Sequence, residues 1–318
     1  METRAVVKSG NTSFTVALPI DWVRRNRLDK GSQVTVTESP AGELLIAAQR
    51  TPTVLQETIT IKVDGKKDEA INLELLQAYI RDYGTIVIEG KELRAKSRAL
   101  LALIKNYIGV DVIEHGVDTI VVKNFFSISK ETAPHTIARK IGAVSRSIFE
   151  VLDALYTKGF TKDDVAEIQR LHEQSERLFN LVRKTTLKLI EHPSLMSQAQ
   201  TDSVQLFKDK LVAMNFRNIA GSLHAVGRTF LLLEHRKKEI ALLQEVMTAT
   251  RKNLELALSV YTRKDYDTLG PMLASITMEN ERWEQLAREV DNALVVDCIR
   301  EAIDCNLFLR DIAHQLLE

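Results

Sequence analysis

The sequence predicts an α+β protein of several domains, with a small β-rich segment at residues 1–50, a small α/β segment at 53–126 and an all-helical segment at 129–318. Three observations lead to this division. In the first segment apolar and polar residues alternate in short runs, which is typical of β-strands. The second segment mixes strand-like and helix-like runs. In the third, apolar residues recur at helical spacing with few interruptions.

Short strands around one helical turn are predicted for residues 1–50. The alternating apolar positions are Phe14, Val16 and Leu18, then Val34 and Val36, then Leu44 and Ile46. A helix at 19–28 is favoured because Pro19 suits the first turn of a helix and Gly31 suits its end. Each strand offers only two or three side chains to a core. A segment this small is marginal alone, so we expect it to need a second copy.

The middle segment predicts the element order βαβαββ. Its predicted strands and helices lie at 58–63, 71–82, 85–88, 91–108, 110–113 and 119–122. Gly84 ends the first helix, and Gly116 opens the turn of the final hairpin. This order indicates a small α/β or α+β sandwich. The residues suggest no chemistry for it, and a rigid spacer or a second dimer contact is the expected role.

Six long helices are predicted for the last segment, at 133–157, 161–191, 199–233, 237–263, 265–292 and 294–317. Three helices repeated twice would form two antiparallel bundles. An acidic pair opens the second helix at Asp163 and Asp164, and another opens the fifth at Asp265 and Asp267. Both pairs are expected at helix N-termini, where the helix dipole favours negative charge.

Composition excludes several classes of protein. Lys plus Arg and Asp plus Glu both number 43, so the overall charge gives no argument for nucleic-acid binding, and any basic surface must be local. The sequence contains no run of about 18 apolar residues, the length that a membrane span requires, and the opening METRAVVKSG lacks an apolar signal region. A cytoplasmic protein is therefore expected. Cys298 and Cys305 lie two helical turns apart, too far for a disulfide, and are interpreted as packing residues.

The opening segment carries a specific series of turn, proline, helix and glycine signals. In order they are Val7-Lys8-x-Gly10, Thr15, Leu18-Pro19, Trp22, Leu28, Lys30-Gly31 and Val34-x-Val36. The series covers about 45 residues and resembles the AbrB/SpoVT family of swapped-hairpin DNA-binding domains. The resemblance implies that two chains interleave their hairpins to close one β-barrel. It therefore implies a homodimer that binds double-stranded DNA.

Five basic residues of this segment are the expected DNA contacts. The resemblance implies that they face the phosphates or the base edges, and they are Arg4, Lys8, Arg24, Arg25 and Arg27. Lysine and arginine contact phosphates, and the arginine fork can also read guanine edges. The alternative is that these residues form a solvated face of a segment that only dimerises.

The helical segment is similar to the PhoU family of phosphate-uptake regulators, which has two three-helix bundles. The similarity rests on this architecture and on Glu173-x-x-Glu176-Arg177-Leu178 in the second helix. The whole chain therefore resembles a PhoU-type regulator with an N-terminal AbrB-like domain, an arrangement of archaeal type. This resemblance implies a role in phosphate uptake or metabolism, with a phosphate transporter or a signalling protein as a further partner.

Proteins that resemble PhoU hold metal clusters on carboxylates three or four residues apart on bundle helices. Here the candidates are Glu173, Glu176, Asp297, Glu301 and Asp304. However, residues 210–233 of the third helix contain no Asp or Glu, although the family pattern places ligands there. We therefore expect no cofactor, and a divalent metal or iron cluster is the alternative.

The chain lacks the usual signatures of enzymes. It has no GxxxxGK[ST], GxGxxG, HExxH or GxSxG motif, and its 13 glycines fit long helices better than a loop-built active site. The sequence therefore predicts a dimeric, DNA-binding regulator of phosphate metabolism that is not an enzyme. Two alternatives remain open. One is an adaptor that docks on a transporter or signalling partner without binding DNA, and the other is a helical sensor that binds a metal cluster.

Overall fold

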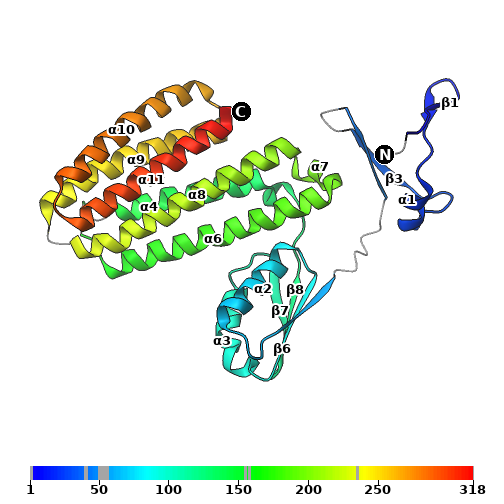
Figure 1. Cartoon of the computed structure of the whole chain (residues 1–318), viewed down its shortest axis with the longest axis horizontal. Helices are drawn as coiled ribbons and strands as arrows, with labels where there is room; N and C mark the ends of the chain where they lie inside the picture. Colours follow the sequence, from blue (N-terminus) through cyan, green and yellow to red (C-terminus); the bar gives the residue numbers. More distant parts are fainter. Residues whose placement is uncertain are drawn as a thin grey trace. The chain divides into compact units, whose positions relative to one another are not determined.

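A computed structural model describes residues 3–38, 42–48, 57–153, 156, 159–233 and 236–317. The chain divides into two compact units, Met1–Leu55 and Gln56–Glu318 (Figure 1). The first contains two hairpins and a short helix. The second contains a four-stranded sheet with two helices, here called the middle region (residues 57–126), followed by the long helices of the helical region (residues 129–317).

In the N-terminal unit, two separate antiparallel hairpins flank one short helix. Strand β1 (Val7–Ser9) pairs with β2 (Ser13–Thr15), and β3 (Val34–Glu38) pairs with β4 (Leu44–Ala48). Helix α1 (Ile20–Arg25) lies between the hairpins in sequence. Gly10 has a φ of +77°, which lets the chain turn tightly between β1 and β2.

The described residues of one chain form no closed barrel, and the predicted barrel would require a second chain. They make two sheets of two strands each. The strand predicted around Phe14, Val16 and Leu18 is also shorter than expected, because β2 ends at Thr15. Two strands expose both edges and one whole face, so neither hairpin can enclose a core by itself.

The middle region has the predicted order βαβαββ. Its elements are β5 (Thr58–Lys62), α2 (Asp68–Ile80), β6 (Thr85–Glu89), α3 (Leu93–Ile104), β7 (Val110–His115) and β8 (Thr119–Asn124). The sheet order is β5-β6-β8-β7, with β5 and β6 parallel and the other pairs antiparallel. Apolar side chains on one face of the sheet form a core with those of both helices, which cover that face (Figure 1).

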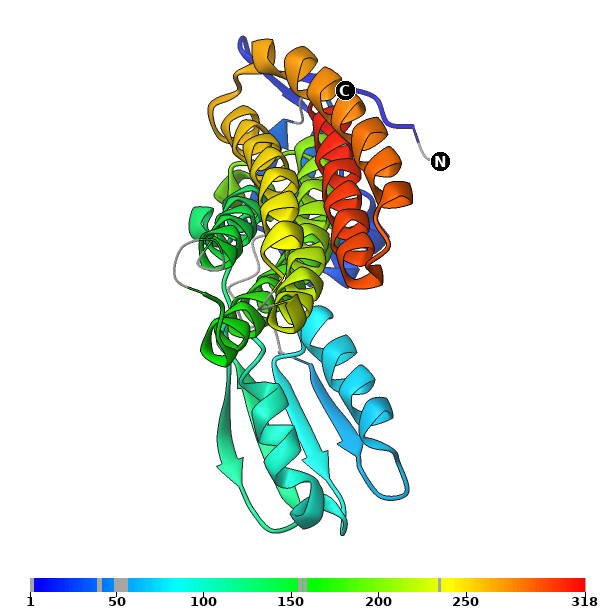
Figure 2. The ribbon, with the colours of Figure 1, turned by 90° about the vertical axis from the view of Figure 1, so that its left-hand side faces the viewer.

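The helical region contains the six long helices that the sequence predicts. They are α4 (Pro134–Leu152), α6 (Lys162–Glu191), α8 (Ser203–Phe230), α9 (Lys237–Arg263), α10 (Leu269–Glu289) and α11 (Ala293–Leu317). A short helix, α7 (Met196–Ala199), precedes α8. The first three long helices pack against one another, and so do the last three, with the axes running side by side (Figure 2).

The two bundles share one continuous core. Helix α8 packs extensively on α11, and α4 packs on α9, so the buried apolar side chains form a single cluster. Gly142 of α4 permits the close approach here, because a Cβ at that position would lie 2.4 Å from Leu258 Cδ2 of α9 and that side chain would have to shift. Cys298 and Cys305 are buried and unpaired in this core, as predicted. Burial raises the pKa of the Cys298 thiol to about 12, so the thiol stays protonated.

The two acidic pairs predicted at helix N-termini have different roles. At α6 the backbone N–H of Thr161 donates to Asp164 Oδ2 at 2.8 Å, and the N–H of Asp164 donates to the Thr161 hydroxyl at 3.3 Å, which forms a capping box. The second pair does not cap α10. A 3₁₀ turn at Tyr266–Thr268 intervenes, and α10 begins at Leu269 without a side-chain cap.

The middle region is attached to α6 through a buried lysine. The Lys184 ammonium lies 3.0 Å from Asp82 Oδ1 and donates to Asn124 Oδ1 at 3.0 Å. It also lies 4.5 Å from the ring centre of Tyr79 and 4.8 Å from that of Phe126. These four partners come from the middle region, so one side chain of α6 contacts four residues of that region.

Candidate functional site

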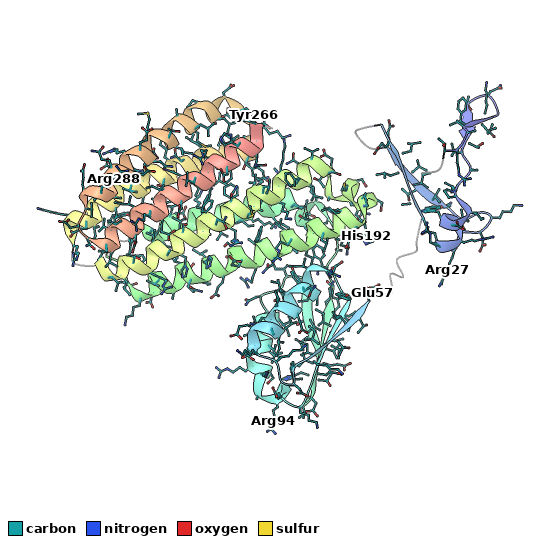
Figure 3. All side chains as sticks on the ribbon, in the orientation of Figure 1. Arg27, Glu57, Arg94, His192, Tyr266 and Arg288 are labelled. Atoms are coloured by element: carbon teal, nitrogen blue, oxygen red, sulfur yellow. The ribbon has the colours of Figure 1, made fainter. Side chains whose placement is uncertain are left out.

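Helix α1 carries the basic turn that the sequence predicts at the DNA surface. It begins directly after Pro19, whose φ of −59° suits a helix start. Arg24 and Arg25 lie in its last turn, where cations complement the helix dipole, and the side-chain amide of Asn26 donates to the Trp22 carbonyl at 2.8 Å. Arg27 follows with a positive φ of 53° and an exposed side chain (Figure 3).

All five predicted DNA contacts are exposed. Arg24 and Arg25 project from α1, and Arg27 follows it. Lys8 lies on β1 opposite Phe14, and Arg4 precedes that strand. All five belong to the N-terminal unit. Because their side chains are exposed, solvent can reach each of them, as a phosphate contact requires.

Large apolar side chains in the same unit are also exposed. The exposed fraction is 59% for Val7, 68% for Phe14, 55% for Val36 and 66% for Leu44. None of the residues of this unit whose burial the structure describes is buried. Alternating strands present these residues as if to a core, yet the described residues of the unit do not cover them.

The predicted metal ligands lie on two helices and are not brought together. Glu173 of α6 accepts a hydrogen bond from the Gln169 amide at 2.7 Å, and Glu176 lies 3.5 Å from Arg217 of α8. On α11, Asp297 lies 3.6 Å from Arg300. Glu301 and Asp304 follow on that helix, the first half-buried and the second exposed. Within the described residues, no group of three or more His, Cys, Asp or Glu side chains could hold a metal ion.

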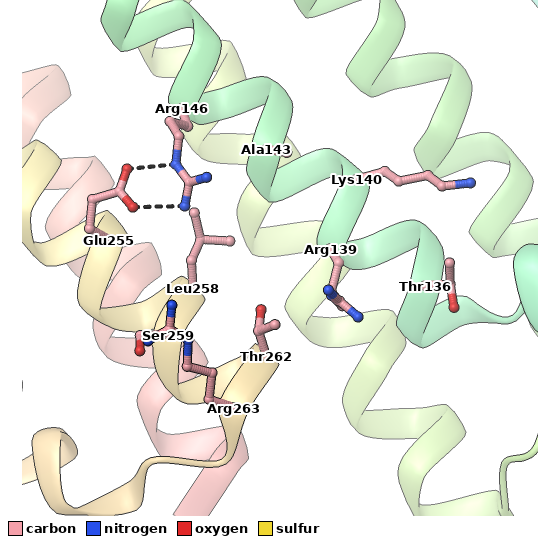
Figure 4. Close-up of a pocket in the computed structure, with 10 residues that line it drawn as sticks. All are labelled: Thr136, Arg139, Lys140, Ala143, Arg146, Glu255, Leu258, Ser259, Thr262 and Arg263. Carbon is pink, nitrogen blue, oxygen red and sulfur yellow. Dashed lines mark hydrogen bonds and ion pairs between the residues drawn. The ribbon is translucent and has the colours of Figure 1, made fainter.

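A groove of about 540 Å³ lies between α4 and α9 (Figure 4). Its ten lining residues are Thr136, Arg139, Lys140, Ala143, Arg146, Glu255, Leu258, Ser259, Thr262 and Arg263. The groove is bounded at one point by an ion pair across the two helices, in which the Arg146 guanidinium donates twice to Glu255, each time at 2.7 Å. It therefore lies where the first bundle meets the second.

The groove is strongly basic. Four of its lining residues are basic and one is acidic, and that one carboxylate, Glu255, is already paired with Arg146. For Arg139, Lys140 and Arg263, the described part of the chain provides no hydrogen bond or ion pair. In Figure 4 the Lys140 side chain extends away from α9, whereas Arg139 and Arg263 lie toward the same end of the groove. At this end of the groove, Arg139 and Arg263 are therefore exposed and form no ion pair with a described carboxylate.

A buried carboxylate contacts His135 and Tyr261, which are the sequence neighbours of the groove residues Thr136 and Thr262. Asp209 of α8 is fully buried, and its Oδ1 accepts from the Tyr261 hydroxyl and the Gln205 amide, each at 2.7 Å. His135 Nδ1 lies 3.4 Å from the same oxygen. Burial, followed by the charge of Asp209, raises the pKa of Tyr261 far above its usual value, so the phenol stays a donor. This network ties α4, α8 and α9 together.

Two histidines stack between α6 and α8. The rings of His172 and His224 lie 4.9 Å apart with an angle of 6° between their planes. Burial lowers the pKa of His224, the neighbouring His172 and Arg228 lower it further, and Glu173 acts in the opposite direction. His224 is therefore expected to be neutral near pH 7.

Sequence reasoning missed both the basic groove and the buried lysine. Arg139 and Arg146 are seven residues apart on one helix, a spacing that places them on the same face, so the sequence did contain a weak signal. No signal could pair them with Arg263 of α9, because that requires the packing of two helices about 120 residues apart.

In comparisons with known proteins, no family model, no curated protein and no solved structure matches the chain. The family resemblances therefore rest only on the sequence motifs and the helix pattern. Among the described residues, none of the helices combines the length and the apolar character that crossing a membrane requires.

Proposed function

We propose that this chain is a homodimeric DNA-binding regulator whose N-terminal unit is completed by a second copy. The observation that carries the proposal is the exposure of the strand residues Val7, Phe14, Val36 and Leu44 beside an exposed basic helix. Interleaving two such units would bury the apolar faces and would double the positive charge of α1 on one surface.

The helical region would supply the regulation. Its similarity to PhoU suggests that the regulated genes serve phosphate uptake or metabolism, and that a phosphate transporter or a signalling protein is a further partner. An enzymatic role is not part of the proposal, because the chain carries none of the catalytic motifs considered above.

The experiment is fluorescence anisotropy of labelled duplexes taken from around the protein's own gene and around phosphate-transport genes, titrated with the full chain. Arg24→Ala combined with Arg25→Ala should weaken binding at least tenfold. Arg288→Ala combined with Arg310→Ala removes the same charge from exposed positions of α10 and α11 and should change it less than twofold. No binding of any duplex by the wild-type chain would instead favour an adaptor that only dimerises through this unit.

A further inference from the structure

The groove between α4 and α9 has the composition of an anion site. Arg139 and Arg263 line it without an ion-pair partner among the described residues, and its one carboxylate, Glu255, is already paired with Arg146. The hydroxyls of Thr136, Ser259 and Thr262 add hydrogen-bond donors to the same lining. The side chains of Arg139 and Arg263 are exposed, so an anion can reach both guanidinium groups from solvent.

We propose that this groove binds a phosphate chain, meaning a pyrophosphate or triphosphate group. The planar fork of arginine matches the oxygens of phosphate and can donate to two of them at once. A volume of about 540 Å³ lies within the range of small-molecule sites and leaves room for more than one phosphate. A chain of linked phosphates offers more oxygens to Arg139 and Arg263 and carries more negative charge than a single phosphate, so it should bind more tightly.

The lining also determines which part of a ligand is recognised. Its apolar members are Ala143 and Leu258, and no aromatic residue belongs to it. A nucleobase would therefore find no ring to stack on, and the phosphate chain would provide the binding energy. Inorganic tripolyphosphate and ATP should consequently bind with similar affinity.

Binding would link the two bundles. Arg139 belongs to α4 of the first bundle, and Arg263 belongs to α9 of the second. A ligand held by both side chains stabilises the packing of the bundles and raises the unfolding temperature. This inference goes beyond the proposed function and does not depend on DNA binding.

The test is isothermal titration calorimetry of the full chain with sodium tripolyphosphate at low ionic strength. Arg139→Gln combined with Arg263→Gln should weaken binding at least tenfold. The matched control is Arg288→Gln combined with Arg310→Gln, which removes two exposed arginines outside the groove and should change affinity less than twofold. Absence of binding by the wild-type chain, or equal losses in both double variants, would overturn the proposal.

A second variant distinguishes loss of the site from loss of folding. Glu255→Gln removes the one carboxylate of the groove and frees Arg146, so tripolyphosphate should bind at least threefold more tightly. Orthophosphate should bind the wild-type chain at least tenfold more weakly than tripolyphosphate. A Glu255→Gln variant that binds no more tightly, or orthophosphate that binds equally well, would contradict the phosphate-chain assignment. Either result leaves the DNA titration unaffected, so the two proposals fail separately.

Discussion

The ammonium of Lys184 on α6 lies 3.0 Å from Oδ1 of Asp82, although the lysine side chain is completely buried. Lys188, one helical turn later, contacts the other carboxylate oxygen. Both pKa values are lowered, which favours the charged form of Asp82 but the neutral form of Lys184. Burial would raise the pKa of Asp82, but Lys184, Lys188 and Asn124 outweigh it and lower that pKa. Burial also lowers the pKa of Lys184. We take the pair as ionised, because two ammonium groups face one carboxylate.

Replacing Lys184 should loosen the attachment of the middle region. Lys184→Met keeps the length of the stem but leaves Asp82 with only Lys188 as a charged partner. Loss of one partner from a buried ion pair costs about 3–5 kcal/mol, and we expect about 1–3 kcal/mol here because Lys188 remains. Urea unfolding measures this change. Lys210→Met, at an exposed position of α8, is the matched control and should stay within about 0.5 kcal/mol of wild type.

The contribution of Asp82 should depend on pH. Because its folded pKa is lowered, its stabilisation is fully present above the unfolded pKa of about 3.9 and is lost as the pH falls through the folded value. Asp82→Asn is a suitable variant, because Asp82 has a φ of +58° and asparagine tolerates that conformation. The variant should lose about 2 kcal/mol at pH 6–7.

Urea unfolding at several pH values measures this contribution. The difference between wild type and Asp82→Asn should shrink below pH 4. Asp118→Asn, at an exposed position of the β7–β8 turn, is the control and should show no such difference. A difference that stayed constant down to pH 2 would mean that Asp82 acts without its charge.

His224 should make the stability sensitive to mild acid. Its folded pKa is lowered by burial and by His172 and Arg228, so between the folded and unfolded values the unfolded chain binds more protons. Stability is therefore present above about pH 6.5 and falls as the pH drops through the folded value. The slope should stay below about 1.4 kcal/mol per pH unit, because a single imidazole changes the number of bound protons by at most one.

Thermal unfolding between pH 7.5 and 5 tests this dependence. His224→Asn should flatten it, whereas His115→Asn, on an exposed position of β7, should leave it as in wild type. Equal slopes in all three proteins would exclude the stacked pair of His172 and His224 as the source.

The exposed strands of the N-terminal unit predict a dimer. Phe14→Asp combined with Val36→Asp puts charge on two strands at positions where the described unit exposes large apolar side chains, so the second copy should dissociate. Sedimentation velocity should give twice 35.9 kDa for wild type and a single chain for the variant. Leu73→Asp, at an equally exposed position of α2, should remain dimeric. A monomeric wild-type chain would contradict the proposed completion of the unit.

Local signals predicted most elements correctly. The period of apolar residues, with Pro134, Gly159 and Pro193 as breaks, predicted helices close to α4, α6 and α8, and the middle region has the predicted order of strands and helices. The strand predicted at residues 16–18 is not formed. These residues were assigned from alternation alone, and the described residues of one chain provide no partner strand that would extend β2.

Long-range features could not be predicted from the sequence. Asp82 and Lys184 are about 100 residues apart, and nothing in either neighbourhood indicates that a lysine in a long helix becomes buried against a turn of the middle region. The single core shared by both bundles depends in the same way on how closely α4 approaches α9 at Gly142.

The central claim, that the N-terminal unit contacts DNA through α1, is tested most directly by the salt dependence of binding. The slope of log K against log salt concentration is negative, and its magnitude should decrease by about 0.9 for each phosphate contact that Arg24→Ala and Arg25→Ala remove. The same slope should remain unchanged in the Arg288→Ala and Arg310→Ala control. A shallower slope in the α1 variant alone is the predicted result. An unchanged slope in that variant would contradict the account and place the DNA contact elsewhere on the chain.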